Sequence, residues 1–416
     1  MEVKKNVPKI RFPQFTEDWE QRKLSEMSDF ITKGATPTTY GFEWVDEGIP
    51  FFRNDAIKDN QFVYGDYSYI SEDANEALSR SEITADDILV AITGDIGKVG
   101  IVPKTIEKAN INQHIARVRI IRDAVPYFIY QSLAREEQQK IYHKIKTGLS
   151  MPQLSLEQIR DTLILCPSYE EQTQIADTLY NLDNLITLHQ RKCVKLKEYK
   201  KGCLQKMFSK EGSDVPEIRF PGFTDDWEQR KVTELGEIYI GLVTTMTSHY
   251  TDHGALLIRN SDIKDGRFEF GDNPIYLDDE FAKQNSSRKH KVGDVITVHT
   301  GDIGTSAVIT EKEADSIGFA TIVTRPNKEK ITSEYLCAYL NTDTHKNFAM
   351  SISTGDGRNN YNLKDYYECV VPVPSIAEQK QISGFIDGLN NLITLHQRKC
   401  DKYRELKKGF LQQMFV

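Results

Sequence analysis

The sequence predicts an α+β protein in which two pseudo-symmetric α/β domains are joined by two long helices that form an antiparallel coiled coil. Three observations lead to this fold class. The chain repeats itself, the middle of each repeat mixes strand and helix patterns, and the end of each repeat carries a heptad of apolar residues. Each is justified in turn below.

The repeat organises the whole chain, and a missed repeat would change the fold assignment. The phrase NLITLHQRKC occurs at residues 184–193 and again at 391–400. PKIRFPQFTEDWEQRKL at 8–24 returns as PEIRFPGFTDDWEQRKV at 216–232. FFRNDAIKD returns as LIRNSDIKD, and AITGDIG returns as VHTGDIG. The two copies therefore make up a tandem duplication, joined by the polar linker SKEGSDV.

The two copies diverge unevenly. The lead-ins and the late helical segments are nearly copied, whereas the middles, at about 28–165 and 236–372, share only short motifs. Nearly identical flanking segments around divergent middles are typical of two recognition modules that are carried by the same scaffold. The predicted boundaries are 1–166 for the first domain, 167–208 for the first long helix, 209–215 for the linker, 216–373 for the second domain and 374–416 for the second long helix.

The middles predict mixed secondary structure. DILVAITGDIGKVGIV and DVITVHTGDIGTSAVI are β-branched runs broken by a glycine-flanked polar turn, which indicates a hairpin or a bulged loop. AVPYFIYQSLAREEQQKIYHKI and ITSEYLCAYLNTDTHKNFAM have the spacing of amphipathic helices. Each domain is therefore expected to hold a twisted, largely antiparallel sheet with helices.

The late segments predict two helices of about 40 residues and about 60 Å each. Each begins with a proline and a capping-box pattern, Ser168-x-x-Glu171 and Ser375-x-x-Glu378. Apolar positions then step by four and three, which favours a left-handed coiled coil, antiparallel about a pseudo-two-fold axis near His189 and His396. The expected seam is Ile175, Leu179, Leu182, Ile186 and His189 against Ile382, Ile386, Leu389, Ile393 and His396.

Two features of the coil admit alternatives. His189 with Cys193, and His396 with Cys400, lie at i, i+4 and could supply zinc ligands, but heptad spacing alone accounts for these positions and is the favoured reading. The run of cations from Arg191 to Lys210 has two possible roles. It either complements the helix dipole and keeps the surface of the coil solvated, or it forms a basic surface that faces phosphate groups.

Composition sets the protein class. The 416 residues suit two domains, and a hydrophobic fraction of 39% with a charged fraction of 27% is typical of a soluble globular protein. No signal peptide or membrane-length segment is apparent, so a cytoplasmic protein with reduced cysteines is expected. The net charge of −8 is only a weak argument against nucleic acid, because the clustering of cations matters more than their sum.

The motifs of catalysts are missing. GDIGK lacks the spacing of a phosphate loop, and the second copy replaces Lys98 by Thr305. The sequence contains no adjacent prolines, no H-E-x-x-H and no G-x-S-x-G, so no catalytic, cofactor-binding or metal-binding residues are assigned. The chain is therefore expected to recognise and bind a partner rather than to catalyse a reaction.

Several polar clusters have the chemistry of base and phosphate recognition, because arginine pairs with guanine and asparagine or glutamine with adenine in the major groove. A structural role in turns remains the alternative for each cluster. The candidates are Arg53, Asn54, Lys58, Thr93, Asp95, Lys98, Asn112, Gln113 and His114 in the first domain, and Arg259, Asn260, Lys264, Thr300, Asp302, Thr305, Arg358, Asn359, Asn360 and Tyr361 in the second.

The order of domain, long helix, domain, long helix, together with the IRFPxFTxDWEQRK lead-ins, the TGDIG turns and the NLITLHQRK helices, resembles the specificity subunit of type I restriction–modification enzymes. The resemblance covers nearly the whole chain. It implies two target recognition domains, each reading one half of a bipartite, asymmetric double-stranded DNA sequence, separated by a coiled coil that docks two methyltransferase subunits. Restriction subunits then complete the cleaving complex.

The resemblance also places the chemistry elsewhere. The recognition domains of that family are similar to that of an adenine-N6 DNA methyltransferase of the TaqI type. S-adenosylmethionine, ATP and magnesium would belong to the partner subunits, and none to this chain. NQHIARVR in the first domain becomes GFATIVTR in the second, so contacts cannot be transferred between the domains. A protein-binding coiled-coil scaffold and a standalone DNA-modifying enzyme remain the alternatives from other functional classes.

Overall fold

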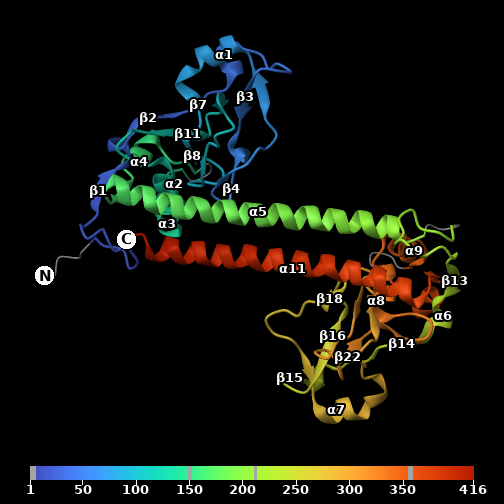
Figure 1. Ribbon diagram of the computed structural model, residues 1–416. Coiled ribbons are helices and arrows are strands. Elements are labelled where there is room, and N and C mark those ends of the chain that lie inside the picture. The colour runs from blue at the N-terminus through green and yellow to red at the C-terminus, as the bar shows by residue number, and fades with distance from the viewer. Residues whose placement is uncertain (1–5, 149–151, 210–212, 355–358) are drawn as a thin grey trace. The chain divides into compact units, whose positions relative to one another are not determined.

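The computed structural model describes residues 6–148, 152–209, 213–354 and 359–416. The chain divides into two compact units. Unit 1 comprises Met1–Leu188 and Lys399–Val416, and unit 2 comprises His189–Arg398. Each unit thus contains one α/β domain together with a part of each long helix (Figure 1).

The strands described in unit 1 form two four-stranded sheets, with the orders β2-β11-β8-β9 and β6-β3-β10-β7, and the two-stranded sheets β1-β12 and β4-β5. All neighbours in these sheets are antiparallel except β3 and β10, which are parallel. The strands are β1 (Glu20–Lys23), β2 (Ser28–Lys33), β3 (Ile49–Phe52), β4 (Ile57–Lys58), β5 (Gln61–Phe62), β6 (Ser68–Ile70), β7 (Glu82–Ile83), β8 (Ile88–Ala91), β9 (Val99–Ile101), β10 (Ala109–Ile111), β11 (Ile115–Ile120) and β12 (Leu163–Cys166). The expected mixed, largely antiparallel architecture is confirmed.

The strands described in unit 2 form the four-stranded sheets β14-β23-β20-β21 and β15-β19-β16-β22 and the two-stranded sheets β13-β24 and β17-β18. The first sheet repeats that of unit 1, whereas in the second β15 lies beside β19, at the edge opposite to the one that β7 occupies in unit 1. Here β16 and β22 are the parallel pair. The strands are β13 (Glu228–Lys231), β14 (Gly236–Ile240), β15 (Tyr250–Thr251), β16 (Ala255–Arg259), β17 (Ile263–Lys264), β18 (Arg267–Phe268), β19 (Tyr276–Leu277), β20 (Val295–Thr297), β21 (Ser306–Val308), β22 (Ile317–Phe319), β23 (Ile322–Pro326) and β24 (Val370–Val373).

Both TGDIG motifs form the turns of antiparallel hairpins, β8 with β9 and β20 with β21. In the first turn Gly94 and Gly97 have φ angles of 69° and 82°, in the left-handed region that glycine adopts without strain. The glycines of the motif therefore allow the backbone to make this tight turn.

Each helical pattern in the middle of a domain is divided into two helices. Residues 124–145 form α2 (Pro126–Ala134) and α3 (Glu136–Ile145), because Arg135 between them has an extended backbone with ψ of 145°. Residues 331–350 form α8 (Ser333–Leu340) and α9 (Asp343–Ile352), where the Thr342 hydroxyl caps the second helix by accepting the His345 N–H at 3.2 Å. The shorter helices are α1 (Glu72–Ala77), α4 (Leu156–Arg160), α6 (Val232–Leu235), α7 (Asp279–Gln284) and α10 (Leu363–Tyr366).

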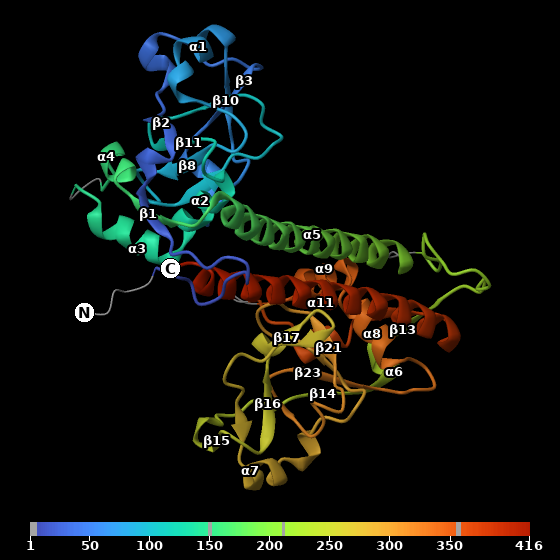
Figure 2. The same ribbon diagram turned by 60° about the vertical axis from the view of Figure 1, so that its left-hand side comes forward.

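Within each domain, some helices lie beside the long helices and others lie far from them. In unit 2, α8 and α9 lie beside the long helices, while α7 lies at the opposite end of the sheets (Figures 1 and 2). In unit 1, α2 lies beside α5 and α1 lies far from it, in the same relation (Figures 1 and 2).

The two long helices are α5 (Tyr169–Met207) and α11 (Ile376–Gln413), and they run antiparallel within each unit. In unit 1, the Cys400 thiol lies 3.9 Å from the Ile186 carbonyl oxygen, and Lys407 bonds Asp183 at 2.8 Å. In unit 2, the Cys193 thiol lies 3.5 Å from the Ile393 carbonyl oxygen. The expected seam residues on both helices are buried, apart from the half-buried His396.

The copied lead-ins secure the starts of the long helices. Ser168 caps α5 by accepting the Glu171 N–H at 3.3 Å, but the Glu171 carboxylate does not return to close a capping box. It accepts two hydrogen bonds from the Arg11 guanidinium, at 2.8 Å each. Arg219 and Glu378 repeat this bidentate pair in unit 2, at 2.8 and 2.9 Å. The IRFP motif therefore clamps the first turn of the helix that follows each domain.

The ends of the long helices are also secured by lead-in residues. In unit 1, Phe415, just beyond α11, packs at 6.1 Å from the ring of Trp19. In unit 2, Phe208, just beyond α5, packs at 6.4 Å from the ring of Trp227. Backbone hydrogen bonds also correspond between the two units. The Ile10 N–H bonds the Gln413 carbonyl in unit 1, and the Ile218 N–H bonds the Lys206 carbonyl in unit 2, both at 2.9 Å.

Candidate nucleic-acid interface

Two of the candidate clusters in unit 1 meet at one edge of a sheet. Arg53 and Asn54 follow β3, and the stretch Asn112 to His114 follows β10, its parallel neighbour. The carboxyl ends of parallel strands lie at the same edge, and the Asn112 N–H bonds the Phe52 carbonyl at 3.0 Å. Segments that are about 60 positions apart in the sequence are thereby placed side by side.

The TGDIG turn joins this edge. The Thr93 hydroxyl lies 2.8 Å from His114 Nδ1, and the Ile92 N–H bonds the His114 carbonyl at 3.0 Å. Gly94 approaches Asn54 so closely that a Cβ atom added there would lie 3.0 Å from Asn54 Nδ2. Three motifs that the sequence offered separately therefore form one surface in unit 1.

A chain of hydrogen bonds orders the polar groups of this surface. Thr36 donates to Gln113 Oε1 at 2.6 Å, and Gln113 Nε2 lies 3.1 Å from His114 Nε2. With the Gln113 amide donating to Nε2 of His114, the Nδ1–H of the same ring donates to the Thr93 hydroxyl. Gln113 is exposed and retains an amide edge for a base, since one of its N–H groups and one of its carbonyl lone pairs are still available.

Arg53 is exposed and held in place from two sides. Its guanidinium carbon lies 5.4 Å from the centroid of the Trp44 ring, and Nη2 donates to the Ser68 hydroxyl at 3.1 Å. A guanidinium stacked on an aromatic ring keeps its remaining N–H groups in a fixed plane. This is the geometry required for bidentate recognition of guanine or phosphate.

The remaining unit 1 candidates lie around these residues. Asp95 is exposed and Lys98 half-buried in the TGDIG turn, while Lys58 is exposed in the β4–β5 hairpin. Asn112 is buried, and its side chain accepts the His114 N–H at 3.1 Å, so it shapes the loop rather than contacting a ligand.

The arginines of NQHIARVR serve the fold. Arg119 forms a bidentate pair with the buried Asp87, at 2.8 and 2.7 Å. Arg117 is buried, donates to the Glu82 carbonyl at 2.6 Å and lies over the Phe30 ring. Arg325 and Asp294 repeat the Arg119–Asp87 pair in unit 2, at 2.9 and 2.8 Å.

In the corresponding loops of unit 2, more of the candidate side chains are engaged in hydrogen bonds and ion pairs within the protein. Arg259 forms a bidentate pair with Asp262, at 3.0 and 2.9 Å, and this hydrogen-bonded carboxylate raises the pKa of the guanidinium. Asn260 accepts the His299 N–H at 2.8 Å and donates to the Ala320 carbonyl at 3.2 Å. Asp302 is exposed in its turn, and Lys264 is half-buried.

The last candidates of unit 2 require correction. Thr305 is 1% exposed and donates to Asp302 at 2.7 Å. Tyr361 is fully buried in the core, 3.2 Å from His345 Nε2, and burial raises the pKa of its phenol. Both residues stabilise the fold, so neither is retained as a DNA contact.

The neighbours of Tyr361 remain near the surface. Asn359 is exposed, and Asn360 accepts a hydrogen bond from the Thr300 hydroxyl at 2.9 Å. Arg358 lies outside the described residues.

Sequence reasoning missed three residues at these surfaces. Trp44 and Thr36 position Arg53 and Gln113, but both belong to the divergent part of the domain, where no repeated motif marks them. Phe319, 38% exposed, takes the place of Gln113 in unit 2. Aligning NQH of the first domain with GFA of the second could have identified Phe319, because a phenylalanine in place of the Gln113 amide changes what this edge can contact.

The histidines of the coil bond each other. In unit 2, His189 Nδ1 lies 2.8 Å from His396 Nδ1. No group of three or more histidine, cysteine or acidic side chains in the described part of the chain has an arrangement that could hold a metal ion. Nor do the described helices include one that is long and apolar enough to span a bilayer.

Comparisons with known proteins agree across the whole chain. The family described as type I restriction modification DNA specificity domain matches residues 16–198 and again residues 224–402. The type I restriction enzyme MjaVIII specificity subunit of Methanocaldococcus jannaschii is 23% identical over 428 residues, which cover 99% of this chain and 95% of that relative.

Two solved structures share the fold. The type I restriction–modification system S subunit from M. genitalium has a TM-score of 0.61 with 14% identity, and the match covers 99% of each chain. A chain from a structure that concerns complex assembly and conformational transition of the type I R-M system has a TM-score of 0.54 with 19% identity, covering 95% of this chain and 97% of that chain.

Proposed function

This chain belongs to the family of type I restriction–modification DNA specificity proteins, and we propose that each of its units reads one half of a bipartite, asymmetric sequence in double-stranded DNA. The frame is common to both units, so each presents its reading edge from the same scaffold. The edges differ chemically, so the two half-sites differ in sequence.

One observation supports this proposal above the others. In unit 1, Arg53, Asn54, Gln113 and the TGDIG turn lie together at the edge formed by the ends of β3 and β10. Exposed guanidinium and amide groups on an ordered frame match the donor and acceptor pattern of the major groove. The same edge in unit 2 carries Asn260, Asp302 and the exposed Phe319.

The chain itself would be the non-catalytic part of a larger cytoplasmic assembly. The long helices dock two methyltransferase subunits that modify adenine at N6, and restriction subunits join them. S-adenosylmethionine, ATP and magnesium bind to those partners. The coiled coil also fixes the gap between the half-sites, because the two reading edges are attached to the same pair of helices.

Exchange of the divergent segments tests this function. We expect that replacing residues 28–165 by the chain's own residues 236–372 gives a protein whose two edges are alike. Its target would then be an inverted repeat of the second half-site. The reciprocal exchange would give an inverted repeat of the first half-site. The measurement is the set of methylated sequences in cells that carry each exchanged chain with its methyltransferase subunits.

The control is the unaltered chain in the same cells, with circular dichroism of each purified exchange protein to establish folding. A folded exchange protein that still directs methylation to the original asymmetric sequence would contradict the proposal.

A further inference from the structure

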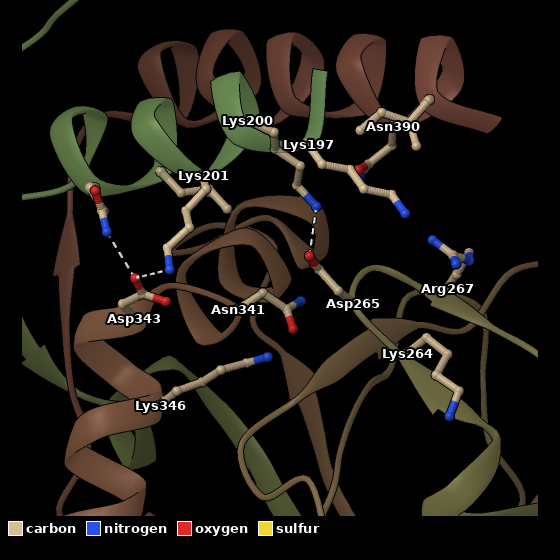
Figure 3. Close-up of a pocket in the computed structure, with 13 residues that line it drawn as sticks. Lys197, Lys200, Lys201, Lys264, Asp265, Arg267, Asn341, Asp343, Lys346 and Asn390 are labelled. Atoms are coloured by element: carbon tan, nitrogen blue, oxygen red, sulfur yellow. Dashed lines mark hydrogen bonds and ion pairs between the residues drawn. The ribbon is translucent and has the colours of Figure 1, made fainter. Parts of the chain in front are cut away.

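Unit 2 contains a cavity of about 390 Å³ in which basic side chains predominate. Its lining comes from α5, α11, the β17–β18 hairpin and the α8–α9 junction, as Figure 3 shows. Six lining residues are cationic and two are acidic: Lys197, Lys200, Lys201, Lys264, Arg267 and Lys346, with Asp265 and Asp343.

The acidic residues compensate only part of this charge. Lys200, whose side chain is 8% exposed, pairs with Asp265 at 2.9 Å, and Lys201 pairs with Asp343 at 3.3 Å. Arg267 pairs with Glu269 at 2.5 Å. Among the described residues, Lys197, Lys264 and Lys346 form no ion pair with a carboxylate, although Lys346 lies close enough to Asp343 to help lower the pKa of that carboxyl. The cavity therefore has an excess of positive charge in a chain whose net charge is −8.

Most of the side chains that carry this charge face the cavity. Lys197 and Arg267 point toward one another across one end, and Lys346 points inward from α9 (Figure 3). Lys264 points away from α5 (Figure 3). The six cations outnumber the two lining carboxylates, so their charges repel one another, and a bound anion would offset this repulsion.

The repeat provides an internal comparison, because unit 1 closes the same place. There Lys407, the counterpart of Lys200, pairs with Asp183 of α5 at 2.8 Å. Tyr127 and Gln131 of α2 also bond Asp183, at 2.5 and 3.1 Å. In unit 2 these three positions are Asn390, Glu334 and Ala338, and Cys337 stands where unit 1 has Tyr130. Smaller side chains and a neutral amide leave the space open.

The charge balance differs in the same way. Of the six cationic positions in unit 2, two become Gln61 and Gln139 in unit 1. The acidic positions gain Asp183 in place of Asn390. The excess positive charge of this cavity thus comes from residues that unit 1 does not share.

We propose that this cavity binds phosphate groups, either of the DNA backbone beside the half-site read by unit 2 or of a free phosphate compound. The inference rests on the proposed function. Lys264 is only four residues from Asn260, so its Cα lies at most about 14 Å from that of the loop residue. This span is compatible with phosphates that flank the bases being read.

The amides of the lining suit the same ligand. Gln205 and Asn390 lie among the cations and offer N–H donors to phosphate oxygens, although one N–H of Gln205 already donates to Asp343 at 2.8 Å. Asn341 also lines the cavity, but its amide donates to the Ser306 and Cys337 carbonyls, at 2.9 Å each. A site with both ammonium and amide donors can hold a phosphate in a defined position rather than merely attract it.

Two variants test the proposal. Lys197→Gln combined with Lys346→Gln removes two uncompensated charges. Asn390→Asp introduces the carboxylate that unit 1 has at this place with almost no change of volume. Lys264 is left intact because it also belongs to the candidate interface. Lys312→Gln combined with Lys328→Gln, both exposed in unit 2, is the control for net charge.

The first arm uses the chain assembled with its methyltransferase subunits. DNA binding is titrated at several salt concentrations, with a duplex that carries the target and one that does not. Each lost phosphate contact lowers the slope of log K against log salt by about 0.9. We expect the lysine double variant to lower the slope by about one to two on both duplexes, Asn390→Asp to lower it by about one, and the control to leave it unchanged.

The second arm uses the full chain alone with inorganic phosphate and pyrophosphate, observed by calorimetry and by the shift in melting temperature. Heat of binding that both cavity variants abolish, with unchanged DNA salt slopes, would assign the site to a free phosphate compound. Altered salt slopes without such heat would assign it to the DNA backbone. Unchanged behaviour of both variants in both arms would overturn the proposal.

The design separates this inference from the proposed function. If the assembled complex does not distinguish target from non-target DNA at all, the proposed function fails. If it does distinguish them and the cavity variants behave as the wild type does, only the cavity proposal fails. Loss of assembly with the methyltransferase subunits, with phosphate binding intact, would indicate an acidic protein surface as the occupant and would likewise overturn it.

Discussion

Two buried histidines of unit 2 make it sensitive to acid. His290 is 1% exposed and lies 2.9 Å from the Ser316 hydroxyl. His345 is also 1% exposed, and its Nδ1–H donates to the Leu340 carbonyl at 2.6 Å. Burial lowers the pKa of each to about 4, from an ordinary value of 6.5. Both are therefore neutral in the folded protein.

The sign of the pH dependence follows from these pKa values. Between pH 6.5 and pH 4 the unfolded chain binds a proton at each histidine and the folded chain does not. The free energy of unfolding of unit 2 therefore falls as the pH falls through this range, by on the order of 2 to 3 kcal/mol for each histidine. Unit 1 has Ile83 and Gln138 at the corresponding positions.

We expect His290→Ile, which installs the unit 1 residue, to reduce this loss of stability by about half. Hydrogen exchange with mass spectrometry at pH 7 and pH 5 measures it, because peptides report each unit separately. Unit 1 in the same sample is the control. An equal loss of protection in both units of the wild type, or an unchanged dependence in the variant, would contradict the explanation.

At the scale of elements, the heptad pattern makes a testable distinction between neighbouring positions of α11. Leu389 is 7% exposed in the seam, whereas Leu392 is 45% exposed on the same helix. Leu389→Asp would bury a carboxylate without a partner, at a cost of about 3 to 5 kcal/mol. Leu392→Asp would cost less than about 0.5 kcal/mol.

Urea unfolding of the two variants measures the difference. Equal midpoints for Leu389→Asp and Leu392→Asp would show that the heptad is not the packed seam in solution.

The elements also show what the sequence could and could not reveal. The long helices and the TGDIG hairpins were predictable, because their patterns extend over many residues or depend on glycine. The break of residues 124–145 at Arg135 was not, because arginine favours helices and only its extended backbone divides the segment.

The candidate site was predictable in residue type but not in position. Arg53 and Asn54, the TGDIG turn and Gln113 were each visible, yet only the parallel pairing of β3 and β10 brings them together. Tyr361 and Thr305 were misjudged because a polar, glycine-rich context suggested exposure, whereas both side chains turn into the core.

At the scale of the whole molecule, the repeat includes the places where the chain begins and ends. Ile10 is bonded to the end of α11 as Ile218 is bonded to the end of α5. A direct peptide bond from Val416 to Met1 would place nine residues between Met414 and Pro8, against eight between Met207 and Pro216. The existing linker and the new junction would then be nearly equivalent.

We therefore expect a circular permutant, closed from Val416 to Met1 and opened within residues 209–215, to fold and to direct methylation to the original sequence. Thermal unfolding and sequencing of methylated DNA check the two parts. A permutant opened between Leu188 and His189, inside α5, is the control and is expected to fail. If the first permutant failed to fold or to direct methylation, the covalent link at 209–215 would be required for folding or function and would not merely connect the two copies.

The packing of Phe415 against Trp19 also bears on the order of events during synthesis. The ribosome releases unit 1's lead-in first, but the buried cluster around Trp19 includes Met414 and Phe415, which are translated at the other end of the chain. Unit 2 lies within one uninterrupted stretch, His189–Arg398, and can complete its core earlier. The domain that is synthesised first therefore cannot complete the core around Trp19 until residues 414 and 415 have been added to the chain.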